Sequence, residues 1–255
     1  MNIHPTALVD PAAQLAEDVE VGPFAIIEGN VTVGNGSKIG PRVLIAKGAR
    51  IGNNVQIFSA AVIATAPQDL KFKGEETFVE IWDRTMIREF VTVNRGTLET
   101  GKTIVGSDCL LMAYSHVAHD CVVGDKVILA NSVNLAGHVH IEEQAIIGGV
   151  VPVHQFVRIG CHSFIAGGTR VPKDVPPYIL AANEPLRYSG LNAVGLKRRG
   201  FSSKTIQALK QAYKIIYLSN LNVSQGIAQI REELELIPEI QNIIDFIEKS
   251  ERGII

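Results

Sequence analysis

Branched apolar residues recur at every sixth position over most of this chain, and no other feature restricts its fold as strongly. Read in steps of six, the positions from Ile3 to Ile63, from Ile81 to Val93 and from Val105 to Val171 are all Ile, Val or Leu, 26 lead positions in total. Chance alternation in an ordinary β-rich sequence does not hold one phase over about 170 residues. A short fixed period instead indicates a solenoid of stacked units.

Each six-residue unit is expected to be one short strand followed by a corner. The lead residue points inward, and a small or β-branched residue four positions later, such as Ala25, fits the crowded interior. Glycine often follows the lead, as at Gly40 and Gly148, and we expect it to supply the positive φ that a corner needs. Three units close a triangular coil of 18 residues, and coils stack about 4.8 Å apart. The predicted fold is mainly β, a parallel β-helix of hexapeptide repeats.

The period is interrupted twice and then stops. Insertions are predicted at about residues 69–80 and 99–104, and insertions in repeat proteins often lie on one face and form a binding edge, although many are tolerated surface loops. From about Ser202 the apolar period becomes helical, with further helices at roughly 224–236 and 239–249 and Pro238 between them. We therefore predict a β-helix over residues 1–180 and a C-terminal α-helical domain over residues 181–255.

Composition excludes several classes of protein. A net charge of −2 argues against a general nucleic-acid binder. Cys109, Cys121 and Cys161 are odd in number and lack C-x-x-C spacing, which argues against a disulfide framework or a structural zinc site and fits a reducing compartment. The start of the chain has no leader pattern, and no later stretch is long enough for a transmembrane segment, so a cytoplasmic location is expected.

The 18-residue coil predicts which polar residues meet. Asp120 and His138 are 18 apart, and the same step leads from His119 to Gly137 and on to Gln155, with His154 beside it and His116 at the preceding corner. A single histidine in such a scaffold is usually structural. A cluster of histidines opposite a glycine that bares its backbone N–H is a candidate site.

These residues are compatible with more than one chemistry. A neutral histidine can take a proton from a hydroxyl that attacks an activated carbonyl, while the N–H of Gly137 stabilises the oxyanion. The chain has no G-x-S-x-G elbow, and Cys121 occupies an inward repeat position, so direct transfer is favoured over a covalent acyl-enzyme. Clustered histidines also bind zinc, as in hexapeptide-fold carbonic anhydrases. A repeat scaffold without chemistry is a third interpretation.

Specific motifs extend over essentially the whole chain. They include His116-Val-Ala-His119-Asp120-Cys, Leu135-Ala-Gly-His138, Val153-His154-Gln155-Phe156 and Gly195-Leu-Lys-Arg-Arg-Gly-Phe201. With these motifs the chain closely resembles the UDP-N-acetylglucosamine O-acyltransferases that begin lipid A synthesis. The resemblance implies a left-handed β-helix and a homotrimer with active sites between subunits. It also implies that a 3-hydroxyacyl chain passes from the phosphopantetheine of acyl carrier protein to the sugar 3-hydroxyl, with no other cofactor and no resident metal.

The resemblance also assigns roles to residues. His119 would be the general base, Asp120 would orient it, and Gly137 would supply the oxyanion N–H. The resemblance further implies a substrate-binding set in two parts. The positions that match it near the sugar and acyl groups are Asp69, Lys71, His116 and His138, and those that match its nucleotide-binding part are His154, Gln155, Asn192, Arg198 and Arg199. For the two arginines, a solvated helix entrance or a contact with the acidic carrier protein is an alternative. Val194 replaces a frequent glutamate of the family, and residues 182–187 diverge from the family pattern.

The length of the acyl chain is expected to depend on Gly167, near Phe164. The resemblance places Gly167 at the floor of the hydrocarbon groove, and 48 residues separate it from His119. That separation is about 2.7 coils, or ~13 Å along the axis. Because glycine leaves the end of the groove open, a long chain of roughly C14 or beyond is expected.

Overall fold

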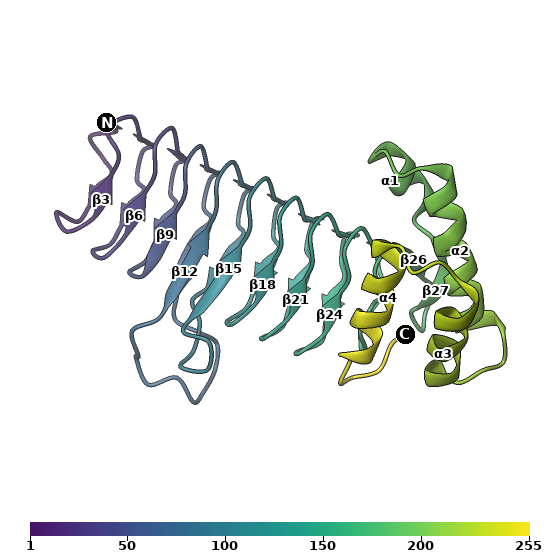
Figure 1. The fold of residues 1–255 in the computed structure, drawn as a ribbon. Helices are drawn as coiled ribbons and strands as arrows, with labels where there is room; N and C mark the ends of the chain where they lie inside the picture. Colours follow the sequence, from purple (N-terminus) through teal and green to yellow (C-terminus); the bar gives the residue numbers. More distant parts are fainter.

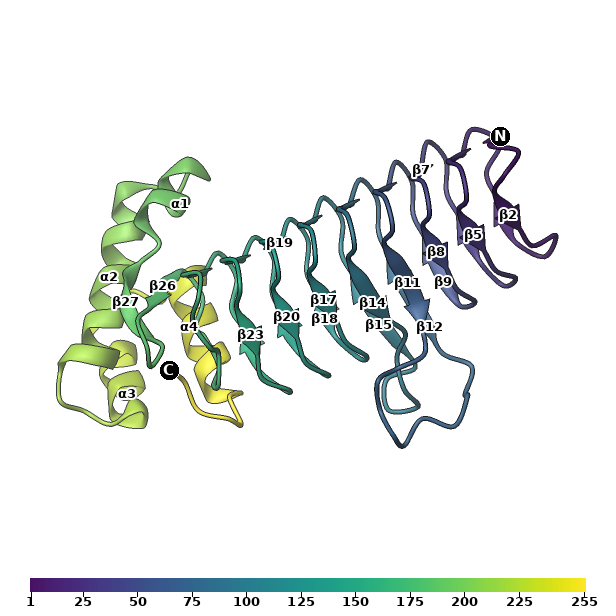
Figure 2. The same cartoon turned by 180° about the vertical axis from the view of Figure 1, so that it is seen from behind.

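The computed structural model describes residues 1–255, and the chain winds into a left-handed parallel β-helix followed by four α-helices. Strands β1 to β25 build three parallel sheets, which are the three faces of a triangular prism. Figure 1 looks onto one face and Figure 2 onto another. The chain visits the faces in the order A, B, C and repeats. We name the corners between them the A–B, B–C and C–A edges.

Most strands contain two residues. Face A consists of β1 (Asn2–Ile3), β4 (Glu20–Val21), β7 (Lys38–Ile39), β10 (Gln56–Ile57), β13 (Met86–Ile87), β16 (Leu110–Leu111), β19 (Ile128–Leu129), β22 (Ile146–Ile147) and β25 (Phe164–Ile165). Face B consists of β2 (Leu8–Val9), β5 (Ile26–Ile27), β8 (Leu44–Ile45), β11 (Val62–Thr65), β14 (Thr92–Asn94), β17 (His116–Val117), β20 (Asn134–Leu135) and β23 (Pro152–Val153). Face C consists of β3 (Gln14–Leu15), β6 (Thr32–Val33), β9 (Ala49–Ile51), β12 (Phe78–Ile81), β15 (Lys102–Val105), β18 (Val122–Val123), β21 (His140–Ile141) and β24 (Arg158–Ile159).

The predicted repeat is confirmed in register and in burial. Asn2 pairs with Glu20 and Val117 with Leu135, so each coil without an insertion advances 18 residues along the sequence. Every lead residue from Val21 to Ile165 is buried inside the prism. Burial of each branched side chain contributes roughly 1.5–3 kcal/mol before the loss of conformational entropy is subtracted. The stacked lead residues therefore form the core that fixes the edges.

The predicted role of the glycines is wrong. Positive φ occurs at the third residue after the lead, as at Arg42 and Asp120, whereas the glycines directly after the lead do not adopt it. A Cβ added at Gly40 would lie 2.8 Å from the carbonyl oxygen of Ile57, and one at Gly148 would lie 2.4 Å from the nitrogen of Gly167. These glycines are therefore needed for close approach between adjacent coils and not for an unusual backbone angle.

Both insertions leave the prism at the B–C edge. The first connects β11 to β12 and the second connects β14 to β15, so each runs from face B to face C. Figures 1 and 2 both show the two loops hanging from one edge near β12 and β15. The two insertions therefore lie on the same side of the prism. The predicted bounds of 69–80 and 99–104 are shifted toward the C-terminus: the insertions occupy residues 66–77 and 95–101, because parallel strand pairing resumes at Phe78 and Lys102.

After β25 the chain extends face A and then becomes helical. Strands β26 (Ile179–Ala182) and β27 (Arg187–Leu191) form an antiparallel pair that continues that sheet. The helices are α1 (Ala193–Arg198), α2 (Ser203–Leu218), α3 (Val223–Glu233) and α4 (Pro238–Glu248). Ser202 caps α2, since its side chain accepts a hydrogen bond from the backbone N–H of Thr205. Pro238 does not separate two helices as expected but is the first residue of α4.

The helices close the C-terminal end of the prism. Tyr213 of α2 is fully buried, and its hydroxyl donates to the carbonyl oxygen of Pro177. The buried carboxylate of Asp174 accepts from the backbone N–H of Arg158 and from the hydroxyl of Ser250, which joins the last coil to the C-terminal segment. None of the helices is long and apolar enough to cross a membrane.

Candidate active site

Three stacked corners of the B–C edge form the centre of the candidate site. Asp120, His138 and Phe156 occupy equivalent positions on successive coils, with φ values of 60°, 61° and 63°. The backbone N–H of His138 donates to the carbonyl oxygen of His119, and that of Phe156 donates to Gly137. The predicted stacking of Asp120 on His138 is therefore confirmed.

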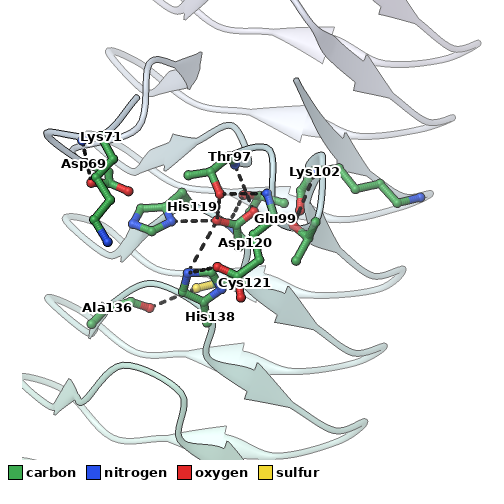
Figure 3. Close-up of polar contacts among 12 residues, drawn as sticks. Asp69, Lys71, Thr97, Glu99, Lys102, His119, Asp120, Cys121, Ala136 and His138 are labelled. Atoms are coloured by element: carbon green, nitrogen blue, oxygen red, sulfur yellow. Dashed lines mark hydrogen bonds and ion pairs between the residues drawn. The ribbon is translucent and has the colours of Figure 1, made fainter. Parts of the chain in front are cut away.

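His119 and Asp120 form a hydrogen-bonded pair (Figure 3). His119 Nδ1 lies 2.8 Å from Asp120 Oδ2, and 15% of the His119 side chain is exposed, whereas the Asp120 side chain is fully buried. Burial by itself raises the pKa of Asp120, but hydrogen bonds from Thr100, His119 and Thr97 outweigh it and hold the pKa below its ordinary value. The ionised carboxylate accepts a hydrogen bond from Nδ1–H, which leaves the lone pair of the ring on Nε2.

His138 adds a second imidazole beside this pair. Its ring meets His119 edge to face at 5.2 Å and stacks on Phe156 at 4.5 Å between ring centroids. Its Nε2 lies 3.7 Å from Asp120 Oδ2 and 3.6 Å from Glu99 Oε2. Two carboxylates therefore face this ring, one buried and one on the second insertion.

Gly137 lies directly against the His119 ring. An added Cβ would meet His119 Cε1 at 2.6 Å, so a larger residue would displace the imidazole. The backbone N–H of Gly137 donates to no acceptor within the protein. A free N–H beside a histidine with an open Nε2 is the arrangement that general-base attack on a carbonyl needs.

A cavity of about 770 Å³ lies over these groups, between the B–C edge and the two insertions. It is lined by Gln68, Asp69, Leu70, Lys71, Phe72, Glu75, Thr97, Leu98, Glu99, His119, His138, Gln155 and Phe156. Five of the predicted site residues therefore line one cavity, and they are Asp69, Lys71, His119, His138 and Gln155. Figure 3 shows Asp69 and Lys71 on the first insertion, on the side of His119 away from Asp120.

The remaining predicted histidines lie outside the cavity lining. His116 belongs to β17 on face B, and its Nδ1 is 2.7 Å from the hydroxyl of Thr92. Burial lowers the pKa of His116, with a smaller contribution from His119, so the ring is neutral. His154 is exposed at the B–C edge, with its Nδ1 3.1 Å from the carbonyl oxygen of Gln155.

The predicted nucleotide-binding residues divide between two places. Asn192 caps α1 by accepting from the N–H of Gly195, and its side-chain amide donates to the carbonyl oxygen of His162 at the C–A edge. Arg198 at the end of α1 is exposed. Arg199 has a buried Nη1 without a partner, and burial lowers its pKa. Within one chain these residues lie on a different edge from His154 and Gln155.

Gly167 and Phe164, the residues predicted to act as a ruler for the length of the acyl chain, also lie away from His119 within one chain. Gly167 directly precedes the A–B corner at Gly168, and a Cβ added at Gly167 would meet the carbonyl oxygen of Gly149 at 3.0 Å. Phe164 is half-buried in β25 on face A. The width of face B therefore separates Gly167 from the B–C edge, in addition to the axial distance calculated from the sequence.

Cys121 cannot act as a nucleophile in this arrangement. Its side chain is fully buried, its Sγ donates to the carbonyl oxygen of Ala136, and burial raises the pKa of the thiol to about 12. The inward position predicted from the repeat is confirmed. The nearest thiol is therefore protonated and shielded from the cavity.

The hexapeptide period does not predict the polar groups of the second insertion. Thr97 and Thr100 donate to Asp120, and Glu99 faces His138. A signal was present, because stepping back by one coil from Asp120 leads into this insertion on the same edge. Nothing in the repeat pattern shows which way the side chains of an irregular loop point.

The same groups could also bind a metal ion. His119, Asp120 and His138 each offer one ligand atom, and these atoms lie within 4.8 Å of one another. Two imidazoles and a carboxylate suit zinc and other divalent transition metals. Asp120, however, already accepts from His119 and both threonines, so a metal ion would have to replace some of these hydrogen bonds.

Comparison with known proteins identifies the family. The family model described as "Udp N-acetylglucosamine O-acyltransferase; Domain 2" matches residues 174–255, and the bacterial transferase hexapeptide model matches residues 12–47 and 102–137. The acyl-[acyl-carrier-protein]–UDP-N-acetylglucosamine O-acyltransferase of Thiobacillus denitrificans is 52% identical over 99% of this chain and 98% of its own length. The protein of that name from Herminiimonas arsenicoxydans is 51% identical over the same shares.

Solved structures agree with these sequence relatives. The UDP-N-acetylglucosamine acyltransferase of Bacteroides fragilis superimposes with a TM-score of 0.97 at 49% identity, with 99% of each chain covered. The Arabidopsis protein of that name is more distant, with a TM-score of 0.83 at 33% identity over 99% of each chain. Identity of this extent over both the prism and the helices shows that the chain belongs to the UDP-N-acetylglucosamine O-acyltransferase family.

Proposed function

We propose that the protein transfers a 3-hydroxyacyl chain from acyl carrier protein to the 3-hydroxyl of UDP-N-acetylglucosamine, the first step of lipid A synthesis. The names of the relatives support the two substrates. The observation that carries the chemistry is the His119–Asp120 pair beside the free N–H of Gly137, with the His119 ring lining the cavity. Three cysteines without disulfides fit a reaction in the cytoplasm.

The transfer needs one proton acceptor and one oxyanion donor. Nε2 of His119 takes the proton of the sugar 3-hydroxyl as its oxygen attacks the thioester carbonyl carbon. Negative charge develops on the carbonyl oxygen and is stabilised by the Gly137 N–H. The carbon–sulfur bond then breaks, and the imidazolium returns the proton to the phosphopantetheine thiolate. Asp120 remains ionised throughout and stabilises the imidazolium.

The cavity also has groups for the substrates. We assign Asp69 and Lys71 of the first insertion to the sugar and acyl groups, with His116 and His138 nearby, because the insertion closes the cavity above His119. His154, Gln155, Asn192, Arg198 and Arg199 remain assigned to the nucleotide. Arg199 has a buried Nη1 that lacks a protein partner, so this buried nitrogen is available to donate to the nucleotide.

A threefold assembly would unite the separated residues. If three prisms turn face B toward a common axis, the A–B edge of each chain meets the B–C edge of its neighbour. The A–B edge carries a column of exposed apolar side chains that suits such a contact, namely Phe24, Phe90, Tyr114 and Val150. Phe90 and Tyr114 stack at 5.0 Å between ring centroids. Gly167 on this edge would then face the neighbour's cavity, where it could limit the acyl chain.

A metal-dependent hydration reaction is the second candidate, because three ligand atoms of His119, Asp120 and His138 converge. The deciding experiment measures acyl transfer from 3-hydroxyacyl carrier proteins of several lengths to UDP-N-acetylglucosamine, with wild type beside His119→Ala, in chelator and with added zinc. Metal-independent turnover that His119→Ala abolishes would support the general-base mechanism. No transfer by the wild type, together with stoichiometric zinc binding that His119→Ala abolishes, would favour the metal site.

A further inference from the structure

The second insertion of the chain forms a cap over one side of Asp120. The backbone N–H of Thr97 donates to Asp120 Oδ1 at 2.9 Å, and the Thr97 hydroxyl donates to Oδ2 at 2.7 Å. The Thr100 hydroxyl makes a further close contact with Oδ1. These groups come from residues that interrupt the hexapeptide period, so the repeat itself does not supply them (Figure 3).

The hydrogen bonds to Asp120 fill its acceptor capacity. Each carboxylate oxygen has two lone pairs, and Oδ1 receives the Thr97 N–H and the Thr100 hydroxyl while Oδ2 receives the Thr97 hydroxyl and His119 Nδ1–H. The Thr97 hydroxyl hydrogen has no other acceptor, whereas Thr100 also lies 2.9 Å from the carbonyl oxygen of Lys102. The hydrogen bond from the Thr97 hydroxyl to Asp120 is therefore stronger than the one from the Thr100 hydroxyl.

This arrangement controls which nitrogen of His119 carries the proton. A carboxylate held from the opposite side by two threonines cannot rotate away from the imidazole. A fixed acceptor opposite Nδ1 favours the tautomer with its N–H on Nδ1 and its lone pair on Nε2. Without that restraint the ring would populate the other tautomer, whose lone pair on Nδ1 faces Asp120 and not the cavity.

We propose that Thr97 and Thr100 are positioning residues for the reaction, because they fix the Asp120 carboxylate and through it the tautomer and orientation of His119. The inference rests on the proposed function for its kinetic readout, but not for its structural one. The charge-assisted hydrogen bonds at Asp120 are of the strong kind, so loss of the Thr97 hydroxyl is expected to lower kcat by roughly 10- to 100-fold.

The test compares Thr97→Val with Thr97→Ser, which keeps the hydroxyl, and with Thr32→Val. Thr32 lies on β6 and makes no side-chain hydrogen bond, so the same substitution there removes a hydroxyl far from the site. For each variant kcat and KM are measured, and ¹⁵N NMR of histidine-labelled, ligand-free protein reports the His119 tautomer. Thermal unfolding of each variant is followed in parallel, and Thr100→Val replaces Thr97→Val if the latter does not fold.

The expected result is a fall in kcat with a smaller change in KM for Thr97→Val, together with a mixed His119 tautomer. Thr97→Ser and Thr32→Val should retain wild-type kcat within about threefold and the Nδ1–H form. An Nδ1–H tautomer in folded Thr97→Val equal to that of wild type would overturn the inference, as would an equal loss of kcat in Thr97→Ser. Absence of acyl transfer by the wild type would refute the proposed function alone, since the tautomer is measured without substrate.

Discussion

A single missing methyl group at Gly137 determines how close the His119 ring lies to the prism wall. The space that a Cβ would need is already occupied by Cε1 of His119 at 2.6 Å. The backbone N–H of the same residue is the proposed oxyanion donor. The distance between base and oxyanion donor is therefore set by a residue without a side chain, and the chemistry tolerates little change there.

Gly137→Ala should lower kcat by about 100-fold, because the methyl group displaces the imidazole from the position that its hydrogen bond to Asp120 requires. Steady-state acyl transfer, with thermal unfolding as a control, measures the effect. The control is Gly226→Ala in α3, which should retain full activity because a Cβ at Gly226 would make only ordinary contacts. Gly101 is unsuitable as a control position because its φ is positive. Wild-type kcat in Gly137→Ala would contradict the tight packing of His119.

Asp120 also links stability to pH. Its pKa in the folded protein lies below the ordinary value, so its hydrogen bonds contribute fully at neutral pH, above the unfolded-state pKa of about 3.9, and are lost as pH falls through the folded pKa. The difference in free energy of unfolding between wild type and Asp120→Asn should therefore shrink as pH falls below about 4. Urea denaturation of both proteins between neutral and acid pH tests this. A difference that grows on acidification would show that the sign is wrong.

Among the elements, the short strands depend on the glycines that follow them. A side chain at Gly148 would meet the backbone of the next coil at 2.4 Å, and backbone atoms cannot move aside as the end of a long side chain can. The glycines that directly follow lead residues, such as Gly40 and Gly148, thus set the separation of neighbouring coils at the corners. A defect there would strain two coils at once.

Gly148→Ala should destabilise the folded protein by about 1–3 kcal/mol, as overpacking does in a rigid core. Gly226→Ala within α3 should instead be neutral or stabilising by up to ~1 kcal/mol, because alanine is the better helix former and its Cβ would meet no atom closer than 3.6 Å. Urea denaturation gives both free energies. Equal effects in the two variants would mean that close approach between coils does not constrain Gly148.

The elements differ in how much of their structure the sequence predicts. A strict period determines strand positions, burial and the stacking of Asp120 on His138, because each coil repeats the same geometry. The same period led to a wrong prediction for the corners. The glycines after the lead residues allow close approach between coils, whereas residues such as Asp120 and His138 adopt the positive φ. The insertions have no repeat to constrain them, so the sequence does not predict the contacts of Thr97 with Asp120.

At the scale of the whole molecule, one chain does not bring all the expected site residues together. His119, the proposed general base, lies on the B–C edge, whereas Gly167 lies beside the A–B edge, across the width of face B. A threefold arrangement with face B inward would place these two edges in contact between neighbouring chains. The acyl ruler would then belong to a different chain from the histidine that it serves.

Mixed oligomers distinguish a ruler in the same chain from one in the neighbour. Gly167→Met alone should shift the preference to shorter acyl chains, because the methionine side chain would fill the open end of the groove. His119→Ala alone should be inactive. When the two variants are unfolded together and refolded as a mixture, transfer of the long chain should return, because active His119 of one chain then meets unchanged Gly167 of the next. If Gly167 instead acts on His119 of its own chain, every active site in the mixture contains methionine, and only short-chain transfer would be recovered.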